Sequence, residues 1–288
     1  MIFFMQVYQS SACEAPVGHF CHSGRIYQCG KGTYQNRRGK ISCKTCPLCT
    51  FCLSTGPVIP NKEIYGAPRH LVKIRFAAIK SNEAYTKSKH SYDSQLFENG
   101  RMKGFVENTR EVIVVSFQGS DGPLDWFRNL KFFKQRYSSC QRCKIHTGFF
   151  EAYSPLRDEM LKKVNNFYQE HPKKVLVTGY SLGGAMATLA AVDLVNARYT
   201  VDLITFGSSR VGNEEFAKYV DRIVTGLNLR VTYRGDSNTI FPFTGYWHVG
   251  QEIHCIGRNK CHVYPAEVDL CHLRANIFDH YMKNYLQI

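Results

Sequence analysis

The chain has 288 residues, carries a net charge of +14 at pH 7, and is 44% hydrophobic. This length holds one domain of ordinary size together with a small one, and no apolar run is long enough to span a bilayer. The charge favours anionic partners such as phospholipid surfaces, but zinc-finger spacing, a phosphate-binding glycine loop and an aromatic RNA-binding motif are all missing from the sequence. We therefore expect no nucleic-acid partner.

The first sixty residues hold seven of the twelve cysteines and few aliphatic side chains. Met1–Val7 is apolar and is followed by small residues, which resembles the end of a secretion signal without its basic segment. From Cys13 to Cys52 no helical or strand periodicity is present, so this segment needs disulfides or metal to fold. Gly56–Lys62 has the composition of a linker. We predict a disulfide-stapled module over residues 1–60 and a second domain over residues 61–288.

Four of these cysteines, Cys43, Cys46, Cys49 and Cys52, are each separated by two residues. Thiolates at that spacing can converge on zinc or on an iron–sulfur cluster, so a metal site is the alternative to disulfides. The ferredoxin pattern, however, ends in a three-residue gap and Cys-Pro, whereas here Pro47 follows the second cysteine of the run. Cys29–Pro47 resembles extracellular cysteine-rich repeats of the ephrin-receptor and growth-factor-receptor type, which implies disulfides and an extracellular address.

Downstream, strand and helix patterns alternate. A helix is predicted around Leu71–Ala84 and is followed by turn-rich sequence. Continuous apolar runs typical of strands buried on both faces lie at Glu111–Ser120, Val175–Thr178, Val201–Gly207 and Leu229–Tyr233. The helices between them are one amphipathic helix with Tyr153, Leu156, Met160, Val164 and Phe167 on one face, one after Ser181, and one from about Asn213. This alternation predicts an α/β fold with a mostly parallel central sheet flanked by helices.

One stretch, Lys174–Ala191, changes from an apolar β-branched run to an alanine-rich run at a serine between glycines. Its centre, Gly-Tyr-Ser-Leu-Gly at residues 179–183, fits the nucleophile elbow, in which a strained and exposed serine joins a strand to a helix. The sequence thus indicates Ser181 as a nucleophile and the Leu182 amide as a donor to an oxyanion. The alternative is a Gly/Ser turn that carries no chemistry.

A serine nucleophile needs a histidine base and an acid that orients the base, and on α/β-hydrolases both follow the serine along the chain. Asp236 lies just past a predicted strand and is the best candidate for the acid. Asp193 and Asp221 fall in helical stretches, where solvated surface charges are expected. The candidates for the base are the late histidines, at His248, His254, His262, His272 and His280.

Five blocks after residue 70 resemble, in order, those of class 3 lipases, the fungal-type lipase and feruloyl esterase family. They are VSFQGS at 115–120, LDWFRNL at 124–130, KIHTGFFEAY at 144–153, ITFGSSRVGN at 204–213 and GYWHVGQEIH at 245–254. The resemblance covers residues 70–288 and implies an α/β-hydrolase fold. It makes Ser181, Asp236 and His280 a catalytic triad and assigns the second oxyanion amide to Ser120, beside that of Leu182.

The resemblance also assigns supporting roles. The segment with Leu124, Trp126 and Phe127 matches a lid, which a Gly-Pro pair before it would let move, unless Trp126 is a fixed part of the wall. His146 and His248 match structural positions, and Asp279 is interpreted as a surface charge. Two disulfides are implied, Cys140 with Cys143 and Cys255 with Cys261. Cys271 and the seven N-terminal cysteines then remain as an even set of eight.

Three positions depart from the family pattern. Gln118 replaces its usual arginine, Ser209 replaces its usual proline, and the loop after Asp236 is shorter than usual. The loss of the arginine would lower activity without abolishing it.

The expected function is hydrolysis of carboxylic esters, of the triacylglycerol lipase type, by an acyl-enzyme on Ser181 and with no cofactor or metal. The expected partner is a lipid or other acyl ester at a lipid–water interface, with binding to anionic surfaces, and the expected location is extracellular. A phospholipase A1 or a feruloyl-type esterase is the alternative within this class. The alternative of another class is a catalytically silent lipase fold that serves binding or adhesion.

Overall fold

The computed structural model describes residues 15, 19–22, 25–28, 33–35, 38, 40, 42–45, 51–53, 56–58, 68–86, 93–120, 133–242, 244–264 and 276–288. The chain divides into two compact units, which we call the N-terminal unit and the main unit. The N-terminal unit comprises Met1–Ile59 with Val268–Leu273, and the main unit comprises Pro60–Glu267 with Arg274–Ile288.

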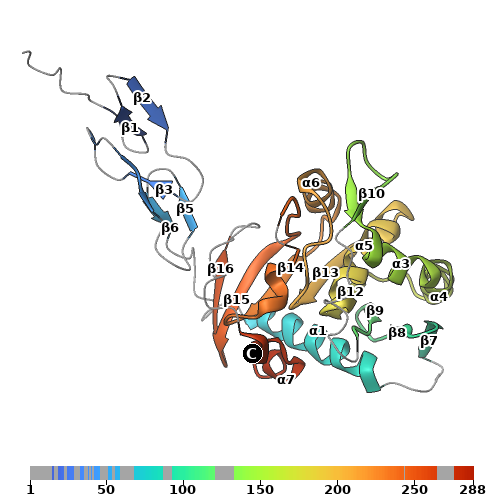
Figure 1. The fold of residues 1–288 in the computed structure, drawn as a ribbon. Helices are drawn as coiled ribbons and strands as arrows, with labels where there is room; N and C mark the ends of the chain where they lie inside the picture. The colour runs from blue at the N-terminus through green and yellow to red at the C-terminus, as the bar shows by residue number, and fades with distance from the viewer. Residues whose placement is uncertain are drawn as a thin grey trace, which may run out of the picture. The chain divides into compact units, whose positions relative to one another are not determined.

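The N-terminal unit contains three short antiparallel hairpins, β1 with β2, β3 with β4 and β5 with β6 (Figure 1). The strands are β1 His19–His22, β2 Arg25–Gln28, β3 Thr33–Tyr34, β4 Lys44–Thr45, β5 Phe51–Leu53 and β6 Gly56–Val58. The linker prediction is wrong at residues 56–58, because these residues pair with β5. The segment up to Cys52 contains strands although its sequence shows no strand periodicity. Strands of two to four residues are too short to produce a readable alternation of side chains.

Cys43 is disulfide-bonded, so its sulfur is not available as the thiolate that the metal alternative requires. The apolar start Met1–Val7 and the cysteines at 13, 29, 46 and 49 lie outside the described residues. The expectations of a secretion signal and of a fully stapled module therefore stay predictions.

The main unit is built on an eight-stranded sheet with the order β16-β15-β14-β13-β12-β9-β8-β7. Its strands are β7 Ser94–Asn99, β8 Met102–Asn108, β9 Ile113–Phe117, β12 Val175–Tyr180, β13 Val201–Phe206, β14 Asn228–Tyr233, β15 Gln251–Gly257 and β16 Lys260–Tyr264. The central strands β9, β12, β13, β14 and β15 run parallel, and the flanking strands pair antiparallel. Within this sheet each strand is paired with the sheet strand that comes next along the chain, so the order in the sheet follows the order in the chain.

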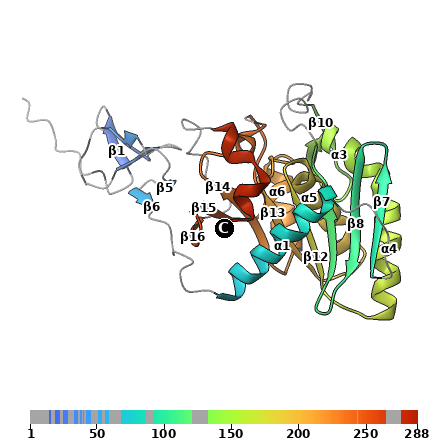
Figure 2. The ribbon, with the colours of Figure 1, turned by 90° about the horizontal axis from the view of Figure 1, so that it is seen from below.

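Helices cover both faces of this sheet (Figures 1 and 2). The helices are α1 Pro68–Thr86, α3 Thr147–Tyr153, α4 Arg157–Glu170, α5 Leu182–Asn196, α6 Glu214–Ile223 and α7 Met282–Tyr285, with 3-10 turns η1 Ser154–Leu156, η2 Ser237–Ile240 and η4 Ile277–His280. The helices α3 to α6 share one hydrophobic core with the sheet, and α1 and α7 share another on the opposite face. Right-handed crossovers in a sheet that grows in one direction place all connecting helices on one face. The second face is therefore left to α1 and α7.

The predicted strands and helices exist, but several details differ. The single amphipathic helix through Tyr153 and Phe167 is in fact α3, η1 and α4, because Pro155 has no N–H and the regular helix ends before it. The turn-rich sequence after α1 forms the hairpin β7–β8 around Asn99 and Gly100, which has φ +59°. A smaller antiparallel ribbon joins β10 Lys134–Arg136 to β11 Lys144–His146. Within the described ranges, none of the helices combines the length and apolar character needed to cross a membrane.

Candidate active site

The turn between β12 and α5 holds Ser181 in a backbone conformation that residues other than glycine rarely adopt, with φ 57° and ψ −124°. Glycines on both sides make this turn possible. A Cβ atom on Gly183 would lie 2.3 Å from the carbonyl oxygen of Phe117, and a Cβ atom on Gly179 would lie 2.3 Å from the backbone of Gly183. The strand and the helix approach this closely only because both positions lack a side chain.

The Ser181 side chain is fully buried, whereas the elbow pattern predicts an exposed serine. Two neighbours account for part of this difference. The imidazole of His280 lies over the hydroxyl, with Nε2 3.0 Å from Oγ. The backbone of Gly119 lies on another side, since a Cβ atom there would be 3.4 Å from the Ser181 Cβ.

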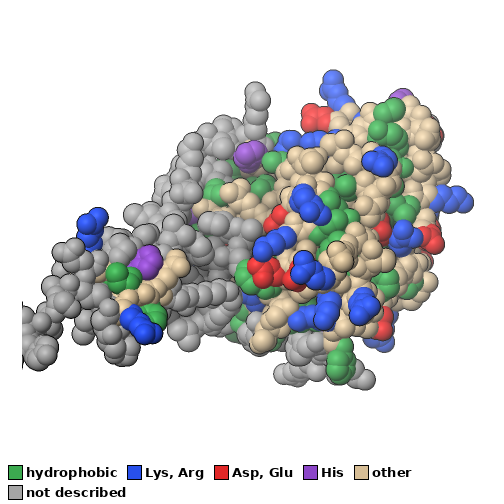
Figure 3. All heavy atoms as spheres, turned by 90° about the horizontal axis from the view of Figure 1, so that it is seen from above, with side chains coloured by type: hydrophobic (Ala, Val, Ile, Leu, Met, Phe, Trp, Pro, Cys, Tyr) green, Lys and Arg blue, Asp and Glu red, His purple; other side chains and the backbone are tan. Residues whose placement is uncertain are grey.

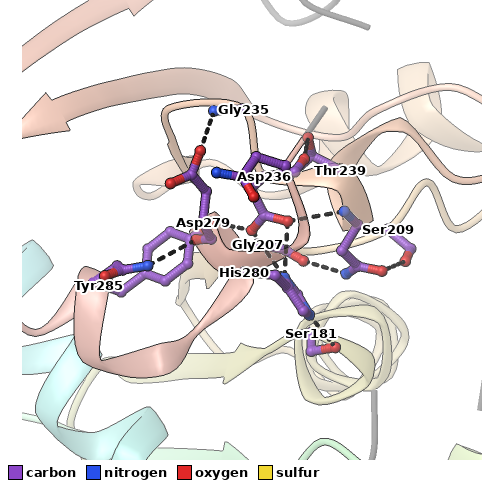
Figure 4. Close-up of polar contacts among 12 residues, drawn as sticks. Ser181, Gly207, Ser209, Gly235, Asp236, Thr239, Asp279, His280 and Tyr285 are labelled. Carbon is purple, nitrogen blue, oxygen red and sulfur yellow. Dashed lines mark hydrogen bonds and ion pairs between the residues drawn. The ribbon is translucent and has the colours of Figure 1, made fainter. Parts of the chain in front are cut away.

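Ser181, His280 and Asp236 form one hydrogen-bonded row at the carboxyl ends of β12 and β14 (Figure 4). His280 Nδ1 lies 2.9 Å from each of the two carboxylate oxygens of Asp236. All three side chains are buried. An N–H at Nδ1 that donates to the carboxylate leaves Nε2 as the acceptor that faces the serine hydroxyl. The structure thus brings together the three side chains that the sequence proposes as a triad.

The loop that carries Asp236 is bonded to a second loop, at the end of β13. The Asp236 carboxylate caps η2 and accepts a hydrogen bond of 2.8 Å from the amide of Asn238. The side chain of Asn238 donates to the carbonyl oxygen of Gly207 and accepts from the Ser209 hydroxyl at 3.1 Å. Ser209, one of the departures from the family pattern, is therefore part of the structure that holds the acid.

Two tyrosines contact His280 and Asp236. The Tyr180 ring lies against the His280 imidazole, with ring centroids 4.8 Å apart and an interplanar angle of 30°. The Tyr285 hydroxyl donates to Oδ2 of Asp236. Burial, followed by the charge of Asp236, raises the pKa of both phenols, so both hydroxyls stay protonated.

A third tyrosine acts on the loop after β9, where the sequence places an oxyanion residue. The amide of Gly119 donates to the Tyr85 hydroxyl on α1 at 2.9 Å. Gly119 precedes Ser120, whose buried hydroxyl oxygen has no hydrogen-bond partner in the part of the chain that the structure describes. On the other side of the serine, α5 begins at Leu182, so its amide has no partner within the helix.

Neither His146 nor His248, both buried, belongs to the row of Ser181, His280 and Asp236. Nδ1 of His146 caps α3 by accepting from the Phe149 amide, and burial lowers the pKa of His146 to about 4. A neutral ring is what this cap requires, because a protonated Nδ1 cannot accept. His146 therefore has a structural contact of the kind predicted for it.

The three carboxylates set aside from the triad all have protein partners. Asp193, expected to be solvated, accepts from Tyr153 at 2.6 Å and from Arg157 at 2.9 Å, and only 11% of its side chain is exposed. Asp221 accepts from the Gly250 amide at 2.8 Å, and burial raises its pKa. Asp279 accepts from the Gly235 amide at 3.1 Å, directly before the acid. The surface-charge interpretation was wrong for Asp193, because its helix faces another helix at that point.

Of the remaining residues predicted from the sequence, the structure describes the two disulfides but not the lid. The structure joins Cys140 to Cys143 and Cys255 to Cys261, the second pair directly across β15 and β16. Leu124, Trp126 and Phe127 of the predicted lid, together with His272 and Cys271, lie outside the described residues. In the described ranges, no group of three or more His, Cys, Asp or Glu side chains is arranged to hold a metal ion.

Sequence reasoning missed the residues that hold the triad in place. Asn238 could have been found, because an Asp two residues before an Asn in a turn-forming stretch is a recognised side-chain-to-backbone turn. Tyr285 and Tyr85 carried no such signal, since each reaches a group that is far away along the chain.

The chain is similar in sequence to known lipases. Residues 114–245 match the family model described as Lipase (class 3), a segment that includes Ser181 and Asp236. The match confirms the resemblance to class 3 lipases.

Three relatives illustrate the range of the sequence matches. The secreted mono- and diacylglycerol lipase 1 of Fusarium solani is 36% identical over 176 residues, which are 60% of this chain and 53% of that protein. A lipase of Rhizomucor miehei is 33% identical over 156 residues, which cover 50% of this chain and 42% of that protein. Phospholipase A1-IIgamma of Arabidopsis thaliana is 31% identical over 176 residues, which cover 50% of this chain and 41% of that protein. The chain thus spans about half the length of the relatives that it matches.

Solved structures support the fold. Lipase II from Rhizopus niveus superposes with a TM-score of 0.68 and 24% identity, over 77% of this chain and 96% of that one. The lipase from Rhizopus microsporus var. chinensis gives a TM-score of 0.67 and 25% identity, over 75% and 87%. The α/β-hydrolase fold predicted from the sequence is confirmed.

Proposed function

We propose that this chain, whose residues 114–245 match the class 3 lipase family model, is a serine hydrolase that cleaves the carboxylic esters of acylglycerols. The observation that carries the proposal is the buried hydrogen-bonded row from Ser181 through His280 to Asp236. A serine in a strained elbow, an imidazole whose Nε2 faces the serine hydroxyl and a buried carboxylate are the parts that acyl transfer needs.

The reaction follows from these contacts. His280 Nε2 takes the hydroxyl proton while Ser181 Oγ attacks the ester carbonyl carbon, and Asp236 stabilises the imidazolium that forms. The imidazolium then gives the proton to the leaving alcohol, and the acyl group stays on Ser181. A water molecule attacks this acyl-enzyme with His280 again as the base, which releases the fatty acid and restores the serine.

The oxyanion of each tetrahedral intermediate would be bound by the amides of Leu182 and Ser120. The Leu182 amide opens α5, where the helix dipole favours negative charge. The Ser120 amide is supported by the hydrogen bond from the neighbouring Gly119 to Tyr85, which fixes the loop beside Ser181. The Ser120 hydroxyl, buried and without a partner among the described residues, is a further donor for the same charge.

Acylglycerols are the proposed substrate class because the Fusarium solani relative is named a mono- and diacylglycerol lipase. Phospholipids are the second candidate, since the Arabidopsis thaliana relative is named a phospholipase A1 and is 31% identical. Both reactions use the same acyl transfer and differ in the alcohol that leaves. A head-group comparison therefore separates them without changing the mechanism.

The proposed site of action is a lipid–water interface. Ser181 is fully buried, so an ester can reach it only after neighbouring groups move. The sequence offers Leu124, Trp126 and Phe127 as the apolar side chains of a lid, which would enter lipid when open. In the described part, Phe133 is 68% exposed at the start of the β10–β11 ribbon. This exposed ring fits a surface that meets lipid.

Anionic lipid is the proposed preference of that surface. Arg136 and Lys144 stand directly opposite each other on β10 and β11, and Lys134 precedes them on the same face. Like charges placed opposite each other destabilise a ribbon, so an anionic surface would relieve their repulsion. Figure 3 shows Lys and Arg side chains scattered over one face, with Asp and Glu among them, and not one basic cluster. We therefore expect this attraction to be modest.

Secretion is proposed on two grounds. Disulfides persist in oxidising compartments, and this chain joins Cys140 to Cys143 and Cys255 to Cys261. Two relatives, from Fusarium solani and Penicillium camembertii, are named secreted lipases. The role proposed for residues 1–60 is a separate extracellular module stapled by its cysteines.

The test is hydrolysis of a panel that contains a triglyceride, a diacylglycerol, a phosphatidylcholine and a feruloyl ester, with Ser181→Ala as the control. We expect the acylglycerols to be cleaved and a fluorophosphonate probe to label the peptide with Ser181. Cleavage of phosphatidylcholine alone would establish the second candidate. Inactivity on every ester, or undiminished labelling of Ser181→Ala, would overturn the proposal and favour a binding role.

A further inference from the structure

The acid of the row, Asp236, has more hydrogen-bond donors than the reaction needs. His280 Nδ1 lies 2.9 Å from both carboxylate oxygens, and the Asn238 amide donates to Oδ1 at 2.8 Å. A third donor, the Tyr285 hydroxyl, binds Oδ2. Tyr285 belongs to α7, five residues after His280, so the base and this donor arrive on the same segment (Figure 4).

The position of the Tyr285 ring is fixed by its surroundings. Its side chain is 1% exposed and packs against the rings of Phe206, Tyr233 and Tyr180, with centroids 5.9, 6.1 and 5.8 Å away. These rings come from three different strands of the sheet. The hydroxyl therefore cannot leave the carboxylate without unpacking one of the two cores of the main unit.

The space in which the hydroxyl meets the carboxylate exists because residue 207 is a glycine. A Cβ atom on Gly207 would lie 2.7 Å from Oδ2 of Asp236 and 3.0 Å from the Tyr285 hydroxyl. Gly207 also has φ +52°, a backbone conformation that other residues rarely adopt. The contact is thus built from three separate segments.

The Tyr285 hydroxyl stays a donor at every pH that matters for catalysis, because burial and then the charge of Asp236 raise its pKa well above the ordinary value. The other ionisable groups beside the carboxylate are Tyr180 on β12, Tyr233 on β14 and Asp279 on η4. Tyr180 is also held neutral by burial, and the Asp279 carboxylate is bound to the Gly235 amide.

We propose that Tyr285 is a positioning residue for the acid of the triad. Its hydroxyl fixes Oδ2 while the Asn238 amide fixes Oδ1, so the carboxylate presents both oxygens to Nδ1 of His280. Without the hydroxyl, the carboxylate is held on one side only and can turn about its own bond. The imidazole then loses its fixed tautomer and its alignment with Ser181. This inference rests on the proposed hydrolase function.

The test compares Tyr285→Phe with Tyr153→Phe. Each change removes one buried hydroxyl that donates to an aspartate, and only the first aspartate belongs to the triad. Both variants should lose thermal stability. Tyr285→Phe should also lower kcat by about tenfold with KM unchanged, as expected for lost alignment. Tyr153→Phe should keep the kcat of the wild type.

The pH profile gives a readout that a merely structural role would not move. Removal of the hydroxyl leaves more negative charge on the carboxylate, which then stabilises the imidazolium of His280 more strongly. The acid limb of the kcat/KM profile should therefore move to higher pH in Tyr285→Phe alone. In an Asp236→Ala background, Tyr285→Phe should have no further effect on kcat.

Proton NMR separates this proposal from the proposed function. The low-field resonance of the His280 Nδ1–H should shift or broaden in Tyr285→Phe and stay in place in Tyr153→Phe. If the wild type cleaves no ester and this shift is still seen, the proposed function fails and the positioning role stands. If both variants match the wild type in kcat, pH profile and resonance, or if Tyr285→Phe still loses tenfold without Asp236, the positioning role is wrong.

Discussion

The two ends of the hydrogen-bonded row from Ser181 through His280 to Asp236 are built in different ways. Ser181 is held by its immediate neighbours in sequence. Gly179 lets β12 approach α5, Gly183 lets α5 approach Phe117 on β9, and Ser181 between them has φ 57°. The acid has no strained backbone of this kind. Asp236 is held by groups from other segments, the side chains of His280 and Tyr285 and, through Asn238, the loop at Gly207.

This difference shows how one site uses two kinds of precision. At the elbow, atoms are placed by volume, because no side chain other than hydrogen fits at the two glycines. At the acid, atoms are placed by donors and acceptors that any small shift of a loop would separate. We therefore expect the elbow to fail by steric clash and the acid loop to fail by loss of hydrogen bonds. Four predictions test this contrast, in order of decreasing effect.

The largest effect is expected at the acid itself. Asp236→Asn keeps the shape of the side chain but places an amide opposite Nδ1 of His280, which favours the wrong tautomer. Turnover should fall by about 10⁴-fold, as it does when the acid of a serine triad is changed to its amide. Steady-state kinetics on an ester that the wild type cleaves measures this loss. His248→Ala is the control and should lower thermal stability with turnover kept. If Asp236→Asn keeps turnover and His248→Ala loses it, Asp236 is not the acid.

The next effect is a clash at the elbow. Gly183→Ala places a methyl group 2.3 Å from the Phe117 carbonyl oxygen, inside a fully buried junction. The free energy of unfolding should fall by about 3 kcal/mol, at the upper end for overpacking. Gly257→Ala is the matched control, because nothing lies within 4 Å of its added carbon. Equal unfolding midpoints for the two variants in denaturant would show that the junction is not limited by volume.

A pH effect is expected at the support of α5. His146 caps α3, which packs on α5 behind the elbow, and burial lowers its pKa to about 4 from an ordinary 6.5. Between these values the unfolded chain binds a proton that the folded chain does not, so stability falls as the pH drops through this window. The loss should be about 3 kcal/mol, since each pKa unit corresponds to about 1.4 kcal/mol.

The variant His146→Asn tests this assignment. Asn caps helices well and does not titrate, so the variant should keep α3 but show a flatter dependence of unfolding free energy on pH between 6.5 and 4. Unfolding in denaturant at several pH values measures the slope. A slope equal to that of the wild type would mean that His146 is not the group responsible.

The smallest effect is expected in the coupling that holds the acid loop. Ser209→Ala and Asn238→Ala each remove one end of a buried hydrogen bond of 3.1 Å. A double-mutant cycle should give an interaction energy of about 1 kcal/mol in unfolding free energy, within the range for hydrogen-bonded neighbours. Strict additivity would show that Ser209 is not part of the support of Asp236.

Much of the elbow could be predicted from the sequence because its determinants are close together. An apolar run, two glycines and an alanine-rich run are enough to indicate a strand, a turn and a helix, and the structure has all three. The same holds for the buried parallel strands. The order of serine, acid and base then narrowed the search for Asp236 and His280, and the family resemblance selected His280 among five histidines.

What could not be predicted depends on contacts between distant residues. Tyr285 meets Asp236 across 49 positions, and Tyr85 meets Gly119 across 34. No residue next to either tyrosine in the sequence indicates which group its hydroxyl contacts. The strands that the sequence does not predict are β7 and β16 at the edges of the sheet and β8 and β15 next to them. Their burial is less complete than that of the central strands, and their apolar runs are interrupted. The burial of Ser181 is also a property of the assembled site and not of the elbow alone.

During synthesis α1 is made before the strands on which it packs. Ser116 on β9, which binds the Lys80 carbonyl, follows that residue by 36 positions, and Thr178 on β12, which binds Ser81, follows by 97. Until those strands emerge from the ribosome, the apolar face of α1 with Ile74, Ala77 and Ala78 has no sheet to cover. Such a face is a target for chaperones and for aggregation. We expect the yield of folded protein to depend on how quickly translation passes β12.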